Sequence, residues 1–150
     1  MTQVYTGQSS HNVKNKLNYI SMVQANELRV GNLLIEENTN SINTVFEIKK
    51  NSTRCSYIRI DNGENHISII QNEYLKPIKL TEEILLNCGA SELVKLNDGY
   101  LRLNLDGIQL SISPERNFFI EYVHQIPIMY VHVLQNFYFA TKQKELEINL

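Results

Sequence analysis

The sequence has few cysteines and no long apolar run, and both scarcities exclude classes of protein. Cys55 and Cys88 are the two cysteines of the 150-residue chain, and they lie in different segments without forming a Cys-x-x-Cys pair. The sequence therefore predicts neither a disulfide framework nor a secreted domain. Every apolar run is much shorter than the roughly 20 residues that a membrane-spanning helix requires. We expect a protein of a reducing cytoplasm that has no membrane partner.

Glycine is scarce as well, and the motifs of common enzyme classes are missing. The six glycines are spread along the chain, most of them at predicted turns, and none belongs to a phosphate-binding loop; no Gly-x-Ser-x-Gly elbow positions a serine nucleophile. Glu82 and Glu83 are adjacent and point apart on a helix, so they do not form a carboxylate pair. Cys55 and Cys88 are interpreted as small packed hydrophobic residues. The sequence predicts no enzyme, no catalytic residue and no cofactor; a small hydrolase or nuclease is the least favoured alternative.

Charge is nearly balanced, with 14 basic and 16 acidic residues and a formal net charge of −2. Such a chain lacks the general basic surface that binds phosphate backbones without sequence preference. Its first 24 residues differ, because they contain Lys14 and Lys16 and no acid. We interpret residues 1–24 as a flexible basic tail that could contact nucleic acid or an acidic partner. The alternative is an unstructured leader with no binding role.

Residues 25–79 have the pattern of a small β-barrel. A turn at Gly31-Asn32 precedes a short strand, and the β-branched run over 41–50 predicts a second strand. Two further strands flank the Asn62-Gly63 dipeptide, and Lys76-Pro77 ends the pattern. Several short strands within about 50 residues predict a curled barrel of the Src-homology type.

The third and fourth strands of this barrel are predicted to form a hairpin. Asn62-Gly63 is typical of a type I′ turn, in which both central residues need positive φ. Pairing outward from this turn places Ile58 opposite Ile67. The apolar side of the hairpin then also holds Ile60 and Ile69. The polar side holds Tyr57, Arg59, His66 and Ser68.

Residues 80–150 are predicted to form a second unit that packs on the barrel. Thr81 followed by two glutamates indicates a capped helix that Gly89 ends. Two Asp-Gly turns and a final apolar run over 118–123 then predict a four-stranded antiparallel meander. A closing helix follows over 130–146, with a broad apolar band. The predicted fold class is therefore α+β.

The two Asp-Gly turns also predict the register of the meander. Pairing about Asp106-Gly107 places Leu103 opposite Leu110. Pairing about Asp98-Gly99 places Leu96 opposite Leu101 and Val94 opposite Leu103. Leucine and isoleucine then share one side of the sheet, which we expect to be its buried side.

The tripeptide Tyr-Val-His occurs twice near the C-terminus, with its histidines at positions 124 and 132. The sequence predicts that His124 ends a strand and that His132 lies in the closing helix. The remaining histidines and cysteines have no recognisable spacing for a zinc site. We interpret both histidines as structural and expect no metal site.

Two surfaces are candidates for binding. Tyr57, Arg59 and His66 combine a stacking ring, a guanidinium group and a second aromatic donor, which suits single-stranded RNA or DNA, or an acidic protein loop. The alternative is an ordinary solvated sheet surface. Gln135 and Phe139 fall on the non-apolar side of the closing helix, where an exposed stripe could bind a partner protein or form a homodimer.

Three blocks of the sequence resemble a protein family. ANELRVGNLL (25–34), LTEEILLNCG (80–89) and YVHVLQNFYFATKQKEL (130–146) are similar, in this order, to blocks of a family of small proteins carried by phages, prophages and mobile elements of Bacteroidota. The chain departs from that pattern at Val133, at Lys142-Gln143-Lys144 and in the residues before Met22. The family has no assigned catalytic residues, so the resemblance implies a bacterial cytoplasm as the setting, and no particular activity.

These observations lead to one expected function and one alternative. We expect a non-enzymatic binding protein of a mobile element that engages a host protein or ribonucleoprotein, as a counter-defence inhibitor of the anti-CRISPR type. The alternative is a sequence-tolerant RNA- or DNA-binding module that uses the polar side of the hairpin and the basic tail.

Overall fold

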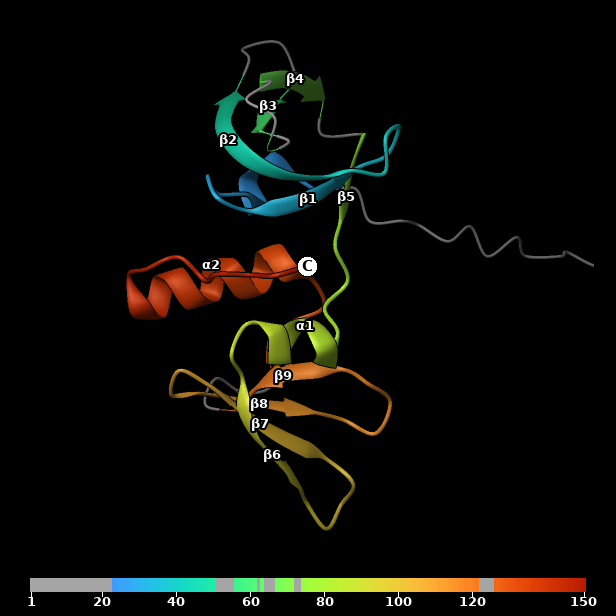
Figure 1. The fold of residues 1–150 in the computed structure, drawn as a ribbon, viewed down its shortest axis with the longest axis vertical. Helices are drawn as coiled ribbons and strands as arrows, with labels where there is room; N and C mark the ends of the chain where they lie inside the picture. The colour runs from blue at the N-terminus through green and yellow to red at the C-terminus, as the bar shows by residue number, and fades with distance from the viewer. Residues whose placement is uncertain (1–22, 51–55, 62, 64–66, 72–73, 122–125) are drawn as a thin grey trace, which may run out of the picture.

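The computed structural model describes residues 23–50, 56–61, 63, 67–71, 74–121 and 126–150 of the chain. Within these residues the chain forms two antiparallel sheets and two α-helices, which confirms the predicted α+β class (Figure 1). Neither helix in this part of the chain is long and apolar enough to cross a membrane.

The first sheet is formed by the N-terminal half of the chain and is strongly curved (Figure 1). A short 3-10 helix, η1 (Ala25–Glu27), precedes it. Its strands, in the spatial order β4-β3-β2-β1-β5, are β1 (Leu33–Glu36), β2 (Ile42–Lys50), β3 (Ser56–Asp61), β4 (Ile67–Gln71) and β5 (Leu75–Pro77). Because β5 returns to pair with β1, the sheet curls around a small apolar core. This core contains Val23, Leu28, Leu34, Val45, Ile60 and Leu75. The described residues do not close into a barrel.

The β3–β4 hairpin has a different register from the predicted one. Ile58 pairs with Ile70, so the predicted pairing of Ile58 with Ile67 is wrong. Ile67 pairs instead with Asp61. The carboxylate of Asp61 accepts a hydrogen bond from the Gly63 N–H at 2.9 Å, a local bond that competes with a tight two-residue turn. The connection between the two strands is consequently longer than a type I′ turn.

The altered register changes which residues of β3 and β4 are neighbours. A slip by an odd number of residues exchanges the two sides of a strand. Ile69 therefore pairs with Arg59, and the prediction that Ile69 shares a side with Ile60 is wrong. Ser68 pairs with Ile60 instead of lying beside Arg59. Ile60 itself is buried in the small core, as predicted.

The second sheet follows α1 (Glu82–Asn87) and belongs to the C-terminal half of the chain. Thr81 caps α1 as predicted, because its hydroxyl accepts a hydrogen bond from the Ile84 N–H at 3.2 Å. The strands, in the order β10-β9-β8-β7-β6, are β6 (Ser91–Lys95), β7 (Leu101–Leu105), β8 (Ile108–Ile112), β9 (Phe118–Ile120) and β10 (Ile126–Pro127). The predicted meander is confirmed, and β10 adds a short strand to it.

The β7–β8 hairpin has the predicted register. Asp106 and Gly107 both have positive φ, of 50° and 81°, as a type I′ turn requires. Leu103 pairs with Leu110, and both side chains are buried. A two-residue turn with this geometry leaves the flanking strands a single way to pair. The Asp106-Gly107 dipeptide was therefore sufficient to predict the register.

The β6–β7 hairpin is shifted by one residue from the prediction. The N–H of Leu96 donates to the carbonyl of Tyr100 at 2.7 Å, so the turn contains three residues and not two. Gly99 takes the left-handed position of this turn, with φ of 86°. The predicted pairings of Leu96 and Val94 are therefore wrong, and Val94 is exposed.

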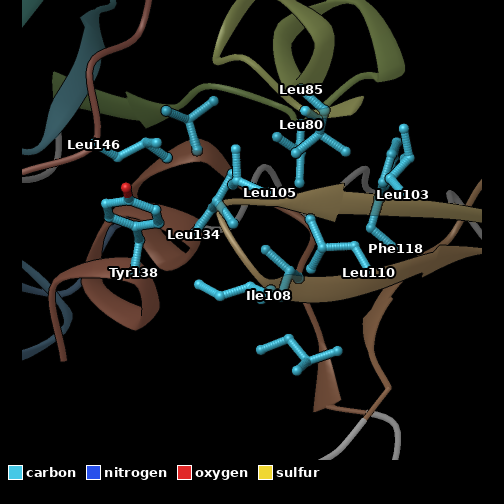
Figure 2. Packing of buried hydrophobic residues seen from close by; sticks show 14 of the residues in the cluster. Leu80, Leu85, Leu103, Leu105, Ile108, Leu110, Phe118, Leu134, Tyr138 and Leu146 are labelled. Carbon is cyan, nitrogen blue, oxygen red and sulfur yellow. The ribbon is translucent and has the colours of Figure 1, made fainter. Parts of the chain in front are cut away.

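α2 (Val131–Lys142) lies between the two sheets (Figure 1). Figure 2 shows Leu134 and Tyr138 approaching the larger core from α2, while Leu80 and Leu85 enter it from the segment around α1. The Tyr138 hydroxyl donates to the Asp106 carboxylate at 2.8 Å, which ties α2 to the β7–β8 turn. The larger core contains Ile78, Leu80, Leu85, Ala90, Leu103, Leu105, Ile108, Leu110, Ile112, Phe118, Ile120, Ile128, Val131, Leu134, Tyr138 and Leu146.

Candidate partner-binding surface

The residues that the sequence singles out for binding fall in separate places. Tyr57 and Arg59 lie two positions apart on β3. Gln135 and Phe139 lie on α2. Lys14, Lys16, His66, His124 and Cys55 lie outside the described residues. The structure therefore bears on two of the predicted surfaces, the outer side of the first sheet and one side of α2.

Phe46 is exposed at a β-bulge in β2. Val45 pairs with Ile60 across β2 and β3, and the next pair is Glu47 with Arg59, so Phe46 is the extra residue of the bulge. Val45 is completely buried in the small core, whereas Phe46 is 52% exposed. Phe46 follows buried Val45 and therefore lies on the outer side of the sheet by simple alternation, while the bulge brings Glu47 to the same side, opposite Arg59.

Arg59 lies beside Phe46 and is held in an ion-pair network. Its Nη1 donates to Glu47 Oε2 at 3.0 Å, and the Nζ of Lys49 lies 3.2 Å from Glu47 Oε1. The guanidinium carbon of Arg59 lies 6.0 Å from the centre of the Phe46 ring, at the limit of a cation–π contact. The hydrogen bonds from Arg59 and then from Lys49 lower the pKa of Glu47. These contacts fix the orientation of the guanidinium group on the surface.

Near β1, α2 covers the outer side of the first sheet, which is the side opposite the small core. There Leu33 and Ile35 pack against the larger core. Farther along the sheet, on β2 and β4, Phe46 and Ile67 remain about half exposed. We call this uncovered surface the β2–β4 face and define it by Phe46, Glu47, Lys49, Arg59 and Ile67.

Gln135 is buried, and the prediction that it belongs to an exposed stripe is wrong. The side chain is 2% exposed and lies between α2 and the segment that enters β1. Its Oε1 accepts a hydrogen bond from the Leu33 N–H at 2.9 Å, and its Nε2 donates to the Gly31 carbonyl at 3.0 Å. Gln135 therefore replaces the missing strand partner of that backbone segment and fastens α2 to the first sheet.

Phe139 is also part of this contact between α2 and the first sheet. The guanidinium carbon of Arg29 lies 3.8 Å from the centre of the Phe139 ring. The same guanidinium group makes two hydrogen bonds to the Glu145 carboxylate, at 2.7 and 2.8 Å. This pairing raises the pKa of Arg29 and lowers the pKa of Glu145. Phe139 is half-buried under Arg29 and belongs to the contact between α2 and the first sheet.

The sequence did not reveal the hydrogen bonds of asparagine side chains that also join α2 to the N-terminal half of the chain. The Nδ2 of Asn32 donates to Asn136 Oδ1 at 2.9 Å, and the Nδ2 of Asn136 donates to the Glu27 carbonyl at 2.7 Å. The sequence feature that could have indicated these contacts is the group of amide side chains on the less apolar side of α2, which includes Gln135. Amides in such a position pair with backbone when the helix is covered on both sides.

His132 is a buried residue of α2. It is 2% exposed, and its ring stacks nearly parallel to that of Tyr130, with 5.9 Å between the ring centres. Its Nδ1 makes no hydrogen bond within the described part of the chain. Burial lowers the pKa of His132, and the charge of Glu27 opposes this shift. The imidazole is consequently neutral at pH 7.

The lowered pKa predicts a dependence of stability on pH. In the unfolded chain His132 takes up a proton near pH 6.5, whereas in the folded chain it resists protonation. The free energy of unfolding should therefore fall as the pH falls below about 6.5, because only the unfolded state gains from the proton. We expect this fall, measured by urea denaturation at pH 7.5 and 5.5, to be smaller in His132→Phe. An identical fall in both proteins would contradict this assignment.

The described residues offer few other groups that could act as a nucleophile or as a metal ligand. Cys88 is half-buried against the larger core, and burial raises its pKa to about 11, so the thiol is protonated at neutral pH. No group of three histidine, cysteine, aspartate or glutamate side chains that could hold a metal ion occurs among the described residues.

The chain was compared with known proteins in three ways. No protein-family model, no curated protein and no solved structure matched it.

Proposed function

We propose that the protein is a non-enzymatic binding protein of a bacterial mobile element that engages a host protein or ribonucleoprotein through the β2–β4 face. The observation that carries this proposal is the half-exposed ring of Phe46 beside the fixed guanidinium of Arg59. Aromatic and arginine side chains are the residues most enriched among those that dominate the energy of protein interfaces. The specific role in this proposal is that of a counter-defence inhibitor of the anti-CRISPR type, and it is motivated by the phage-like setting of the similar sequences and by the absence of an enzyme motif in the sequence.

The charges of the β2–β4 face favour a protein surface as its partner. Glu47 accepts from Arg59 and lies beside Lys49, so one carboxylate offsets part of the positive charge. The exposed Ile67 adds apolar area that a phosphate backbone does not use. An apolar centre with hydrogen-bonding charges around it is the usual composition of a protein interface.

We further infer that the first sheet is an open relative of the small Src-homology type of barrel. Two features support this inference: the strand order β4-β3-β2-β1-β5 and the return of β5 to β1. In such a fold the outer side of a curled sheet is available to a partner when no helix covers it.

Replacing the aromatic ring of Phe46 by a carboxylate should strongly reduce partner capture. We expect Phe46→Asp to recover the partner from a Bacteroidota host lysate about tenfold less well than the unmodified chain, because an anchor residue of an interface is removed. Quantitative mass spectrometry of the captured proteins gives the ratio. Val94→Asp is the matched control, since Val94 is equally exposed on β6 in the other sheet. Equal recovery by the two variants would rule out the β2–β4 face.

The nucleic-acid alternative makes a different prediction for the same face. If Arg59 contacts RNA or single-stranded DNA, binding should weaken steeply as the salt concentration rises, and Arg59→Ala should reduce the slope. Capture by a protein-binding face should change much less with salt. Nuclease treatment of the lysate separates the two cases, because a nucleic-acid partner is then lost and a protein partner is retained.

A further inference from the structure

A surface hollow lies in the C-terminal half of the chain, away from the β2–β4 face. Two adjoining volumes, of about 220 and 100 Å³, share as lining residues Lys79, Leu80, Arg116 and Phe118. Glu82 borders the larger volume, and Met129 borders the smaller one. The hollow therefore lies where the segment before α1, the β8–β9 turn and the segment before α2 meet.

Arg116 is held at the edge of this hollow by an unusual backbone conformation. Its φ is 64°, in the left-handed region that an arginine rarely adopts. The N–H of Arg116 donates to the Ser113 carbonyl at 2.9 Å, and the N–H of Ser113 donates to the Asn117 carbonyl at 2.9 Å, which closes the turn. The Nη1 of Arg116 donates to Glu82 Oε2 at 2.5 Å, while most of the side chain stays in solvent. Strained residues of this kind often occur where a side chain is held for a ligand.

The bottom of the hollow is apolar and rigid. Leu80 and Phe118 are buried members of the larger core (Figure 2). The N–H of Leu80 donates to the Met129 carbonyl at 2.9 Å, which joins the two segments on either side of the hollow. Met129 itself is half exposed at the edge. An apolar side chain that enters the hollow would therefore meet a fixed surface and an adaptable methionine.

The charges around the hollow favour an anionic group in the occupant. Lys79 and Arg116 are cationic, and Glu82 offsets one of the two charges. Glu115 borders only the smaller volume, where a hydrogen bond from Ser113 lowers its pKa and keeps it negatively charged, so the excess of positive charge lies at the larger volume. Among the described residues, Lys79 takes part in none of the ion pairs. A carboxylate above the apolar floor would contact Lys79 and could share Arg116 with Glu82.

We propose that this hollow binds a short peptide segment of a partner protein, in which an apolar side chain stands next to a carboxylate. Each of the two volumes is smaller than the roughly 300 to 1,000 Å³ of a typical small-molecule pocket, so the larger one suits one leucine-sized anchor of a partner protein. The apolar floor takes the anchor, and the cations Lys79 and Arg116 take the acid. This site is separate from the β2–β4 face, and it holds whether or not that face binds a partner.

The test is a titration of the full chain with two synthetic peptides, followed by the amide signals in NMR spectra. The probes are acetyl-Gly-Asp-Leu-Asp-Gly-amide and its neutral twin, in which asparagine replaces both aspartates. We expect the acidic peptide to shift the amide signals of Leu80, Arg116 and Phe118, and to bind about fivefold more tightly than the twin, as two solvent-exposed ion contacts allow. Equal binding of both peptides, or no shift at these amides, would overturn the proposal.

Variants of the two cations separate this site from a general charge effect. Arg116→Gly keeps the left-handed backbone without strain, so the variant should fold and should bind the acidic peptide about two- to fivefold less tightly. Lys79→Gln should weaken binding to a similar extent. Lys142→Gln removes one positive charge at the end of α2 and should leave binding unchanged. A short oligothymidylate that shifts the same amides more strongly than the acidic peptide would show that the site takes nucleic acid and would overturn the peptide assignment.

Discussion

Replacing Gln135 by leucine should lower the free energy of unfolding by about 2 to 5 kcal/mol. The substitution removes the acceptor of the Leu33 N–H and the donor to the Gly31 carbonyl, both of which lie beneath α2. Each buried backbone group that loses its partner costs about 1 to 3 kcal/mol, and the apolar leucine cannot replace either bond. Urea denaturation followed by circular dichroism measures the change.

Two further measurements make this prediction specific. Gln109→Leu, the same substitution at a partly exposed position of β8, should change the stability by no more than about 0.5 kcal/mol. Amide hydrogen exchange at Leu33 should become much faster in Gln135→Leu, because its N–H loses the protecting acceptor. If Gln135→Leu were as stable as the unmodified chain, α2 would not be fastened to the first sheet in this way.

Replacing Leu103 by alanine should lower the free energy of unfolding by about 2 to 5 kcal/mol. Leu103 is completely buried in the larger core, so its removal leaves a cavity that rigid neighbours fill poorly. Urea denaturation at neutral pH gives the difference. A loss of this size is a large part of the total stability of an ordinary domain.

Val94→Ala is the matched control for the core substitution. The sequence pattern assigns Val94 to the same buried side as Leu103, but the observed register leaves Val94 51% exposed. Its truncation should therefore change the stability by about 0.5 kcal/mol or less. Comparable losses for Val94→Ala and Leu103→Ala would favour the two-residue turn over the three-residue turn that the structure contains.

Local turn chemistry explains which parts of the fold could be predicted. Asp106-Gly107 forms a turn whose two residues both need positive φ, and the alternation of β7 and β8 agrees with it. The cap of α1 at Thr81 likewise depends on residues within one helical turn. Where the deciding contacts join residues that are close in sequence, the sequence alone is sufficient to predict the local structure.

The errors arise where two local signals compete. Asn62-Gly63 and Asp98-Gly99 resemble the turn at Asp106-Gly107, yet both connections are longer. In the first, the carboxylate of Asp61 binds the Gly63 N–H. In the β6–β7 connection, Gly99 occupies the left-handed position at the end of a three-residue turn. The dipeptide alone does not distinguish these cases, because the choice depends on residues just outside it.

The β2–β4 face could be predicted only in part, because its composition depends on contacts between residues that are distant in sequence. Arg59 lies on an uncovered part of the sheet, but its neighbours are Phe46 and Glu47 of β2, which the hairpin register alone could not reveal. A bulge depends on how a curved sheet packs, and therefore on contacts distant in sequence. The same holds for Gln135, whose backbone partners lie about a hundred residues away.

The most direct test of the proposed binding function is photo-crosslinking inside host cells. A benzoylphenylalanine at position 46 would lie on the β2–β4 face, and the same residue at position 94 would be equally exposed on the other sheet. We predict that irradiation joins the position-46 chain to one defined host protein, seen as a single heavier band, and that the position-94 chain gives no such band. The same band from both positions, or none from position 46, would contradict the account.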